Sequence, residues 1–136
     1  MTLTTLCPNS IPLIPPPNAS QTDLPLLAKF SEAYKLWHSF LSRLPRLTRF
    51  SLGVKIDNLF TDCLELTLLA GYANREDKSK IIQKLSAKLD CLKFFLKTLW
   101  ELNGLDYKKY SALSLPLAAS GKMIGGWINI FKKSSH

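Results

Sequence analysis

The feature of this sequence that most constrains its fold is the spacing of its apolar side chains. In four successive segments an apolar residue recurs at every third or fourth position, which places those residues on one face of an α-helix. The clearest example is the set Leu27, Phe30, Tyr34, Trp37, Leu41 and Leu44. Four amphipathic helices joined by short loops predict an all-α fold, an antiparallel up-down-up-down four-helix bundle.

Local start and stop signals set the expected helix boundaries. Pro45 ends the first helix, because proline disfavours the helical conformation in the residue before it. Asn74 is an expected N-cap, and Asn103 with Gly104 is a stop signal. Pro116 should kink the fourth helix or delay its start. The predicted helices cover about 24–44, 48–71, 76–102 and 108–133.

The first 22 residues differ in composition from the rest of the chain. They carry no charged side chain, and six of the eight prolines fall within residues 1–25. Proline fixes φ and removes a donor, so this segment predicts a flexible, disordered, polyproline-like arm. We therefore expect an arm over 1–22 and one bundle domain over 23–133. An unstructured tail and an arm that docks on a partner are both open.

The chain is basic, with a net charge of +8 from 18 Lys and Arg against 10 Asp and Glu. This balance favours polyanionic partners such as nucleic acid or an anionic membrane surface. No segment reaches the roughly 18 consecutive apolar residues of a membrane span. The N-terminus also lacks the basic and continuous apolar regions of a secretory signal. A cytoplasmic location without a membrane partner is the expectation.

Residues suited to catalysis or metal binding are sparse. His38 and His136 are far apart in sequence, which is a weak basis for acid–base chemistry or a metal site. Asp62 and Glu65 are three residues apart, but no Glu-x-x-His pattern follows them, as a di-iron bundle site would need. The three cysteines have no CxxC spacing. We expect no catalytic residue, no metal and no cofactor, and therefore no enzyme.

Basic residues are the better candidates for function. Arginine binds phosphate through a planar fork that makes paired hydrogen bonds, although lysines on helix faces are also ordinary solvated surface. The tryptophans lie on or beside apolar stripes and are expected in core or subunit contacts rather than as stacking platforms. The candidate contacts to nucleic acid or a partner are Arg43, Arg46, Arg49, Lys80, Lys84, Lys93, Lys97, Lys132 and Lys133.

The closing segment GKMIGGWINIFKK, residues 121–133, places three glycines within a helical pattern. Each glycine in a helix interior costs about 1 kcal/mol relative to alanine. They are expected where another backbone approaches closely, either a helix of the same bundle or another subunit. Apolar surface beyond one core favours a subunit. The predicted helix-packing or subunit-interface residues are Phe60, Phe94, Gly121, Gly125, Gly126 and Trp127.

Three stretches carry a resemblance to a known family: GKMIGGWINIFKK, the preceding KLDCLKFFLKTLWELNGLDYKKYSAL, and RLTRFSLGVKIDNLF at the start of the second helix. They resemble the four-helix-bundle family of the accessory variability determinant (Avd) of diversity-generating retroelements. The same family includes proteins encoded in intervening sequences of bacterial 23S ribosomal RNA genes. The resemblance covers about 27–133. The Pro-rich arm and the apolar ALSLPLAASGK stretch depart from the family's pattern.

The resemblance implies a homopentamer with a basic surface, in which five copies of +8 carry +40. It implies a non-catalytic accessory protein that binds a reverse transcriptase and template RNA or cDNA and supports mutagenic reverse transcription. The alternative is a stand-alone protein of the intervening-sequence type with an RNA-associated or structural role. A basic amphipathic bundle that acts at membranes or as a protein–protein adaptor is a third possibility.

Overall fold

A computed structural model describes residues 23–134 of the chain. This part contains four long helices and no strand, which confirms the prediction of an all-α fold. The predicted arm, residues 1–22, lies outside the described residues. The helical elements are α2 (Asp23–Leu41), α3 (Arg46–Thr48), the π-helical turn η1 (Arg49–Gly53), α4 (Val54–Tyr72), α5 (Arg75–Glu101) and α6 (Tyr107–Ser134).

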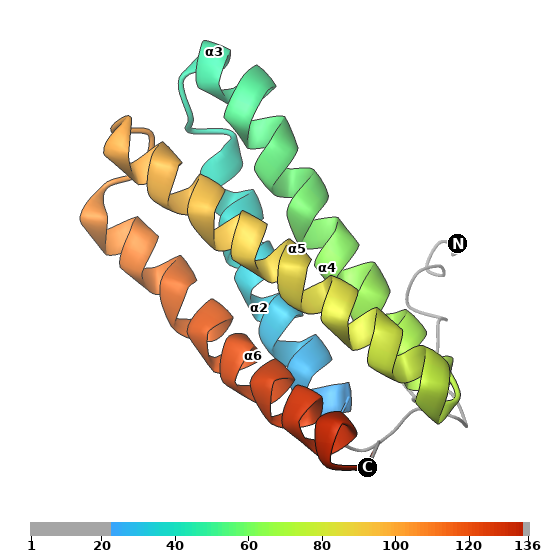
Figure 1. Cartoon of the computed structure of the whole chain (residues 1–136). Helices are drawn as coiled ribbons and strands as arrows, with labels where there is room; N and C mark the ends of the chain where they lie inside the picture. The colour runs from blue at the N-terminus through green and yellow to red at the C-terminus, as the bar shows by residue number, and fades with distance from the viewer. Residues whose placement is uncertain (1–22, 135–136) are drawn as a thin grey trace, which may run out of the picture.

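The four long helices surround a single core. Helix α2 packs on α4 and α6, and α5 packs on the same two helices from the opposite side. Figure 1 shows that each long helix runs back beside the previous one, so the start of α2 and the end of α6 lie at the same end of the bundle. The start of α5 is at that end too. This arrangement brings the first turn of α5 and the last turns of α6 close together.

The core is built from large apolar side chains of all four long helices. Each long helix turns one apolar face toward this core, which is the usual pattern in a bundle. The largest fully buried side chains are Trp37, Phe30, Phe60, Leu26, Ile56, Ile82, Leu85, Leu92, Leu96, Leu99, Leu113 and Leu117.

An aromatic cluster joins α2 to α4. The ring of Phe60 lies 5.8 Å from that of Tyr34 and 6.0 Å from that of Trp37, measured between centroids. The indole Nε1 of Trp37 donates a 3.2 Å hydrogen bond to Oδ1 of Asp57. Burial raises the pKa of Tyr34, and the hydrogen bond and negative charge of Asp57 raise it further. Phe60 is therefore a packing residue inside the chain and adds nothing to a subunit surface.

Helix ends follow the predicted signals with three differences. Helix α2 ends at Leu41, before the predicted end at 44, because a turn over 42–44 precedes Pro45. Oδ1 of Asn74 accepts the Asp77 N–H at 2.8 Å, as expected of an N-cap. Helix α6 begins at Tyr107 and runs through the buried Pro116, so of the two expected effects of this proline, a kink or a delayed start, the delay does not occur. Its beginning is fixed instead by Asp106, whose Oδ1 accepts the Lys109 N–H at 2.8 Å.

The end of α5 differs from the usual helix C-terminus, in which a glycine takes the left-handed conformation. Asn103, not Gly104, adopts the left-handed conformation, with φ of 65°. Gly104 is needed for space, because a Cβ there would overlap Cδ1 of Leu99. Asparagine tolerates the left-handed region better than most residues, so it can end a helix in place of glycine.

The three glycines of α6 have different surroundings. A Cβ at Gly121 would lie 3.1 Å from Nζ of Lys93, so the Lys93 side chain crosses close to this glycine. Added Cβ atoms at Gly125 and Gly126 meet nothing within 4 Å in the described part of the chain. Close approach of a helix in the same bundle therefore does not account for these two glycines, and contact with another subunit stays a prediction.

Replacing Gly126 by alanine should raise the free energy of unfolding by about 1 kcal/mol, because the helix gains propensity and the new methyl group meets no neighbour. Gly104→Ala is the contrasting variant and should destabilise, because its methyl group overlaps Leu99. Urea denaturation followed by circular dichroism measures both changes. A destabilised Gly126→Ala protein would show that some neighbour, such as another subunit, occupies that space.

Cys63 should make the fold sensitive to alkali. Burial raises the pKa of its thiol to about 12, and the charge of Asp62 contributes to the rise. Above pH 9 the thiol ionises in the unfolded chain but not in the folded one, so stability falls as pH rises toward 12. Between pH 8 and pH 10.5 wild type should lose about 2 kcal/mol more than Cys63→Ala, as urea denaturation at each pH would show. Cys91→Ala, at an exposed position, should keep the wild-type loss, and an equal loss in Cys63→Ala would contradict this account.

Candidate nucleic-acid interface

The three predicted arginines around the first turn have different roles. Arg43 and Arg46 are exposed at the turn after α2 and on α3. The Nη2 atom of Arg49 donates to the backbone carbonyl oxygens of Ser42 at 3.0 Å and Leu44 at 3.1 Å. Arg49 therefore closes the turn between α2 and η1, and only Arg43 and Arg46 present their guanidinium groups to solvent.

The predicted lysines lie on α5 and α6. Lys80, Lys84, Lys93 and Lys97 are exposed on α5, and Lys132 is exposed near the end of α6. Lys133 belongs to α6 but lies beyond the last side chain that the structure describes. These lysines lie on α5 and α6, whereas Arg43 and Arg46 lie at the turn after α2 and on α3.

A hollow between α5 and α6 holds Lys93 and Gly121 together. It has a volume of about 270 Å³, and Lys122 and Asp90 also line it. Gly121 makes room for the Lys93 side chain, as described above. A smaller hollow of about 110 Å³ lies between the same two helices and is lined by Lys132 and Phe131. Cationic side chains thus occur along the α5–α6 seam.

The other two predicted interface residues, Phe94 and Trp127, lie in different settings. Phe94 is 63% exposed on the outer side of α5, where its ring contacts that of Phe95 at 5.5 Å between centroids. Trp127 is half-buried on α6 and packs against the core. Phe94 therefore keeps an outward apolar surface, whereas Trp127 belongs to a concave site at the end of the bundle.

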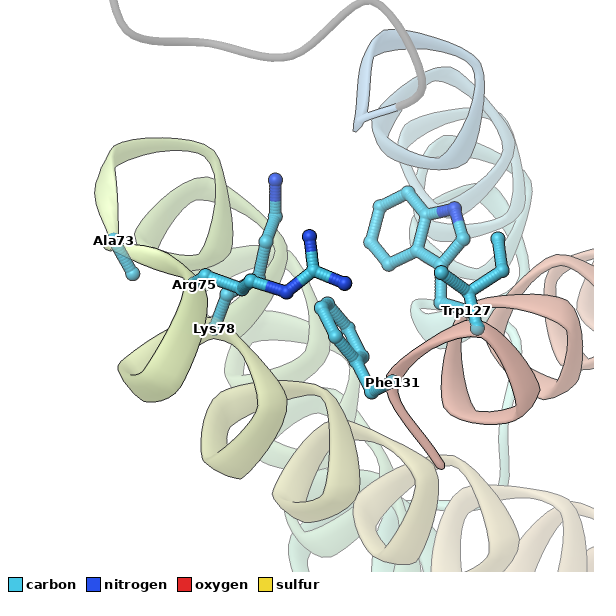
Figure 2. Close-up of a pocket in the computed structure, with 6 residues that line it drawn as sticks. Ala73, Arg75, Lys78, Trp127 and Phe131 are labelled. Carbon is cyan, nitrogen blue, oxygen red and sulfur yellow. The ribbon is translucent and has the colours of Figure 1, made fainter. Parts of the chain in front are cut away.

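That concave site, which we call the end pocket, has a volume of about 330 Å³. Figure 2 shows Arg75 and Lys78 extending from the start of α5 toward Trp127 and Phe131 of α6. A volume of this size is at the lower limit of small-molecule sites. The residues that line the end pocket are Ala73, Arg75, Lys78, Trp127, Ile130 and Phe131.

Each aromatic ring of the end pocket has a cation over its face. Cζ of Arg75 lies 5.9 Å from the centroid of Phe131, and Nζ of Lys78 lies 5.7 Å from the centroid of Trp127. The negative face of the ring attracts the cation, which contributes about 0.5–1 kcal/mol at sites open to solvent. The pairing concentrates positive charge beside two flat apolar surfaces.

Helix geometry explains why these four side chains meet. Trp127 and Phe131 are four residues apart in α6, and Arg75 and Lys78 are three apart in α5, so each pair shares one helix face. Both rings pack partly against the core, which fixes their positions. The Asn74 cap holds the first turn of α5 in place. A rigid aromatic wall thus faces two long, adaptable cationic side chains.

Most residues of the end pocket are not among the functional residues predicted from sequence. Arg75, Lys78 and Phe131 were not among the candidate contacts, and Trp127 was expected in helix packing or a subunit interface. A usable signal was present, because an up-down bundle places the first turn of its third helix beside the last turns of its fourth. Cations in one turn and aromatic residues in the other then predict a mixed site at that end.

No group of three or more His, Cys, Asp or Glu within residues 23–134 is arranged to hold a metal ion. None of the described helices is both long and apolar enough to cross a membrane. No protein-family model matches the sequence, and no curated protein matches it. The resemblance to the Avd family therefore stays a prediction.

Arg49→Gln should lower the free energy of unfolding by about 2 kcal/mol, because it removes charge-assisted hydrogen bonds to two carbonyl groups. Arg43→Gln and Arg46→Gln are matched controls at exposed positions and should change stability by less than about 0.5 kcal/mol. Thermal and urea denaturation of the three variants provides the comparison. Equal stability of all three would mean that Arg49 does not hold the turn.

Proposed function

We propose that this protein is a non-catalytic nucleic-acid-binding bundle that acts beside the reverse transcriptase of a diversity-generating retroelement. The observation that carries nucleic-acid binding is the end pocket, where two cations and two aromatic rings face one another in a chain of net charge +8. Cations attract the phosphate backbone, and aromatic faces accept bases. The resemblance to the Avd family suggests the reverse transcriptase and its template RNA or cDNA as partners.

The proposed assembly is a homopentamer of up-down-up-down bundles. The order of helix contacts and the path of the chain in Figure 1 support the antiparallel arrangement. Outward apolar side chains support association, since Leu115 of α6 is 73% and Phe94 of α5 63% exposed. Lys122 is the only charged residue between Tyr110 and Phe131. The number five comes from the resemblance, and five 15.3 kDa chains would give a mass of about 77 kDa in light scattering.

The proposed role implies a cytoplasmic location, and one alternative function remains. Both proposed partners, a reverse transcriptase and its RNA, act in the cytoplasm, so we place the protein there. A stand-alone protein of the intervening-sequence type would share the fold and the basic charge but would have no reverse transcriptase partner. Binding to the enzyme therefore separates the two functions, whereas RNA binding alone does not.

The central prediction is that the tagged protein co-purifies with the retroelement's reverse transcriptase and RNA as one complex. Raising the salt from about 50 to about 200 mM should lower the affinity of the protein for RNA by orders of magnitude, because counterions are released when the protein contacts phosphates. An unrelated polymerase with the same RNA is the control. If the protein elutes folded and oligomeric but apart from the reverse transcriptase, the retroelement role is wrong and the stand-alone alternative gains support.

A further inference from the structure

We infer that the end pocket binds one unpaired nucleotide, so that the protein prefers single-stranded to double-stranded nucleic acid. The inference rests on the proposed function, since it takes nucleic-acid binding as given and assigns it a place and a strand preference. The volume of about 330 Å³ suits a single small ligand and excludes a helical duplex, which could meet this end only by its outer surface.

The chemistry of the lining fits the two halves of a nucleotide. Trp127, Phe131 and Ile130 form an apolar wall that can cover a base. Arg75 and Lys78 are the charged groups among the six described lining residues, and both are cations. Guanidinium groups bind phosphate through paired hydrogen bonds, and ammonium groups bind it as point charges. One site thus offers a surface for the base and positive charge for its phosphate.

The side chains of Arg75 and Lys78 can bind phosphate without any movement of the two aromatic rings. Arg75 is exposed and Lys78 half-exposed, and both have long flexible side chains. Their positions over the rings, 5.9 and 5.7 Å from the centroids, keep them within the pocket before any ligand arrives. The rings pack against the core of the bundle and do not have to move. Preorganised rings reduce the entropy lost when a base binds.

The positive charge of the site does not depend on the helix N-terminus. The N–H of Asp77 in the first turn of α5 already donates to the side chain of Asn74. Glu76 and Asp77 also place negative charge in that turn. An anion in the pocket would therefore be held by the side chains of Arg75 and Lys78. Substitution of those two residues should remove this contribution.

Strand preference follows from access to the base. In a duplex each base is stacked on both faces, so its flat surface cannot reach Trp127 or Phe131 without leaving the helix. In a single strand the base can turn outward and stack on an aromatic side chain. Phosphate contacts, in contrast, are available in both forms. Loss of the rings should therefore lower single-strand affinity selectively, whereas loss of surface charge should lower both affinities.

The test measures binding of the full chain to a 12-nucleotide RNA, single-stranded and as a duplex, at low salt by fluorescence anisotropy. Trp127→Leu and Phe131→Leu keep an apolar side chain but remove the ring, and circular dichroism checks that each variant is folded. Arg75→Gln/Lys78→Gln is compared with Lys80→Gln/Lys84→Gln, which lowers the net charge by the same amount on the same helix outside the pocket.

The inference predicts that each ring variant binds the single strand about tenfold more weakly and the duplex with nearly unchanged affinity. The ratio of single-strand to duplex affinity should fall more in the Arg75→Gln/Lys78→Gln variant than in the Lys80→Gln/Lys84→Gln variant. Tryptophan emission should fall on binding oligouridine in wild type and not in Trp127→Leu.

Two other results would overturn the inference and can be told apart. Equal affinity of folded ring variants and wild type for the single strand, or an equal fall for both forms of RNA, would place nucleic-acid binding elsewhere on the protein. The end pocket would then no longer support the proposed function, although RNA binding by the chain would stand. If wild type binds neither form at low salt, nucleic-acid binding itself is wrong, and the proposed function fails together with the inference.

Discussion

The burial of one core between the apolar faces of four helices is the constraint on which the rest of this structure depends. Leu85 and Leu92 of α5 and Leu113 and Leu117 of α6 are fully buried, which fixes how these two helices lie along each other. The first turn of α5 consequently meets the last turns of α6. The end pocket exists because of that placement. The proposed function therefore depends on the apolar stripes as much as on the charges.

The helical stripes allowed the fold class to be predicted, because a period of three and four residues has one interpretation in a chain this long. The side chains that are buried differ in detail from the expected stripe. In α2 Leu26 is fully buried and Leu27 only partly, since a small rotation of the helix decides between neighbouring positions. Rotation depends on packing with α4 and α6, which a single segment does not encode.

The candidate site was harder to predict for a related reason. Local spacing grouped Arg43, Arg46 and Arg49, but whether a guanidinium meets solvent or a carbonyl group depends on the path of the turn. Trp127 has helical spacing typical of a core residue, and its second role beside Lys78 requires that α5 and α6 be aligned. The apolar face of a single helix could be predicted from sequence. Contacts between two helices could not, because they depend on how the helices are placed relative to each other.

The central claim is that nucleic acid meets this protein at the end pocket. Ultraviolet crosslinking of a 4-thiouridine-containing single-stranded RNA to the full chain, followed by mass spectrometry of the digested protein, tests it most directly. The account predicts that the dominant crosslinked peptide comes from the last turns of α6 and carries the RNA on Trp127 or Phe131. Crosslinks confined to other helices, with the α6 peptide unmodified, would contradict it.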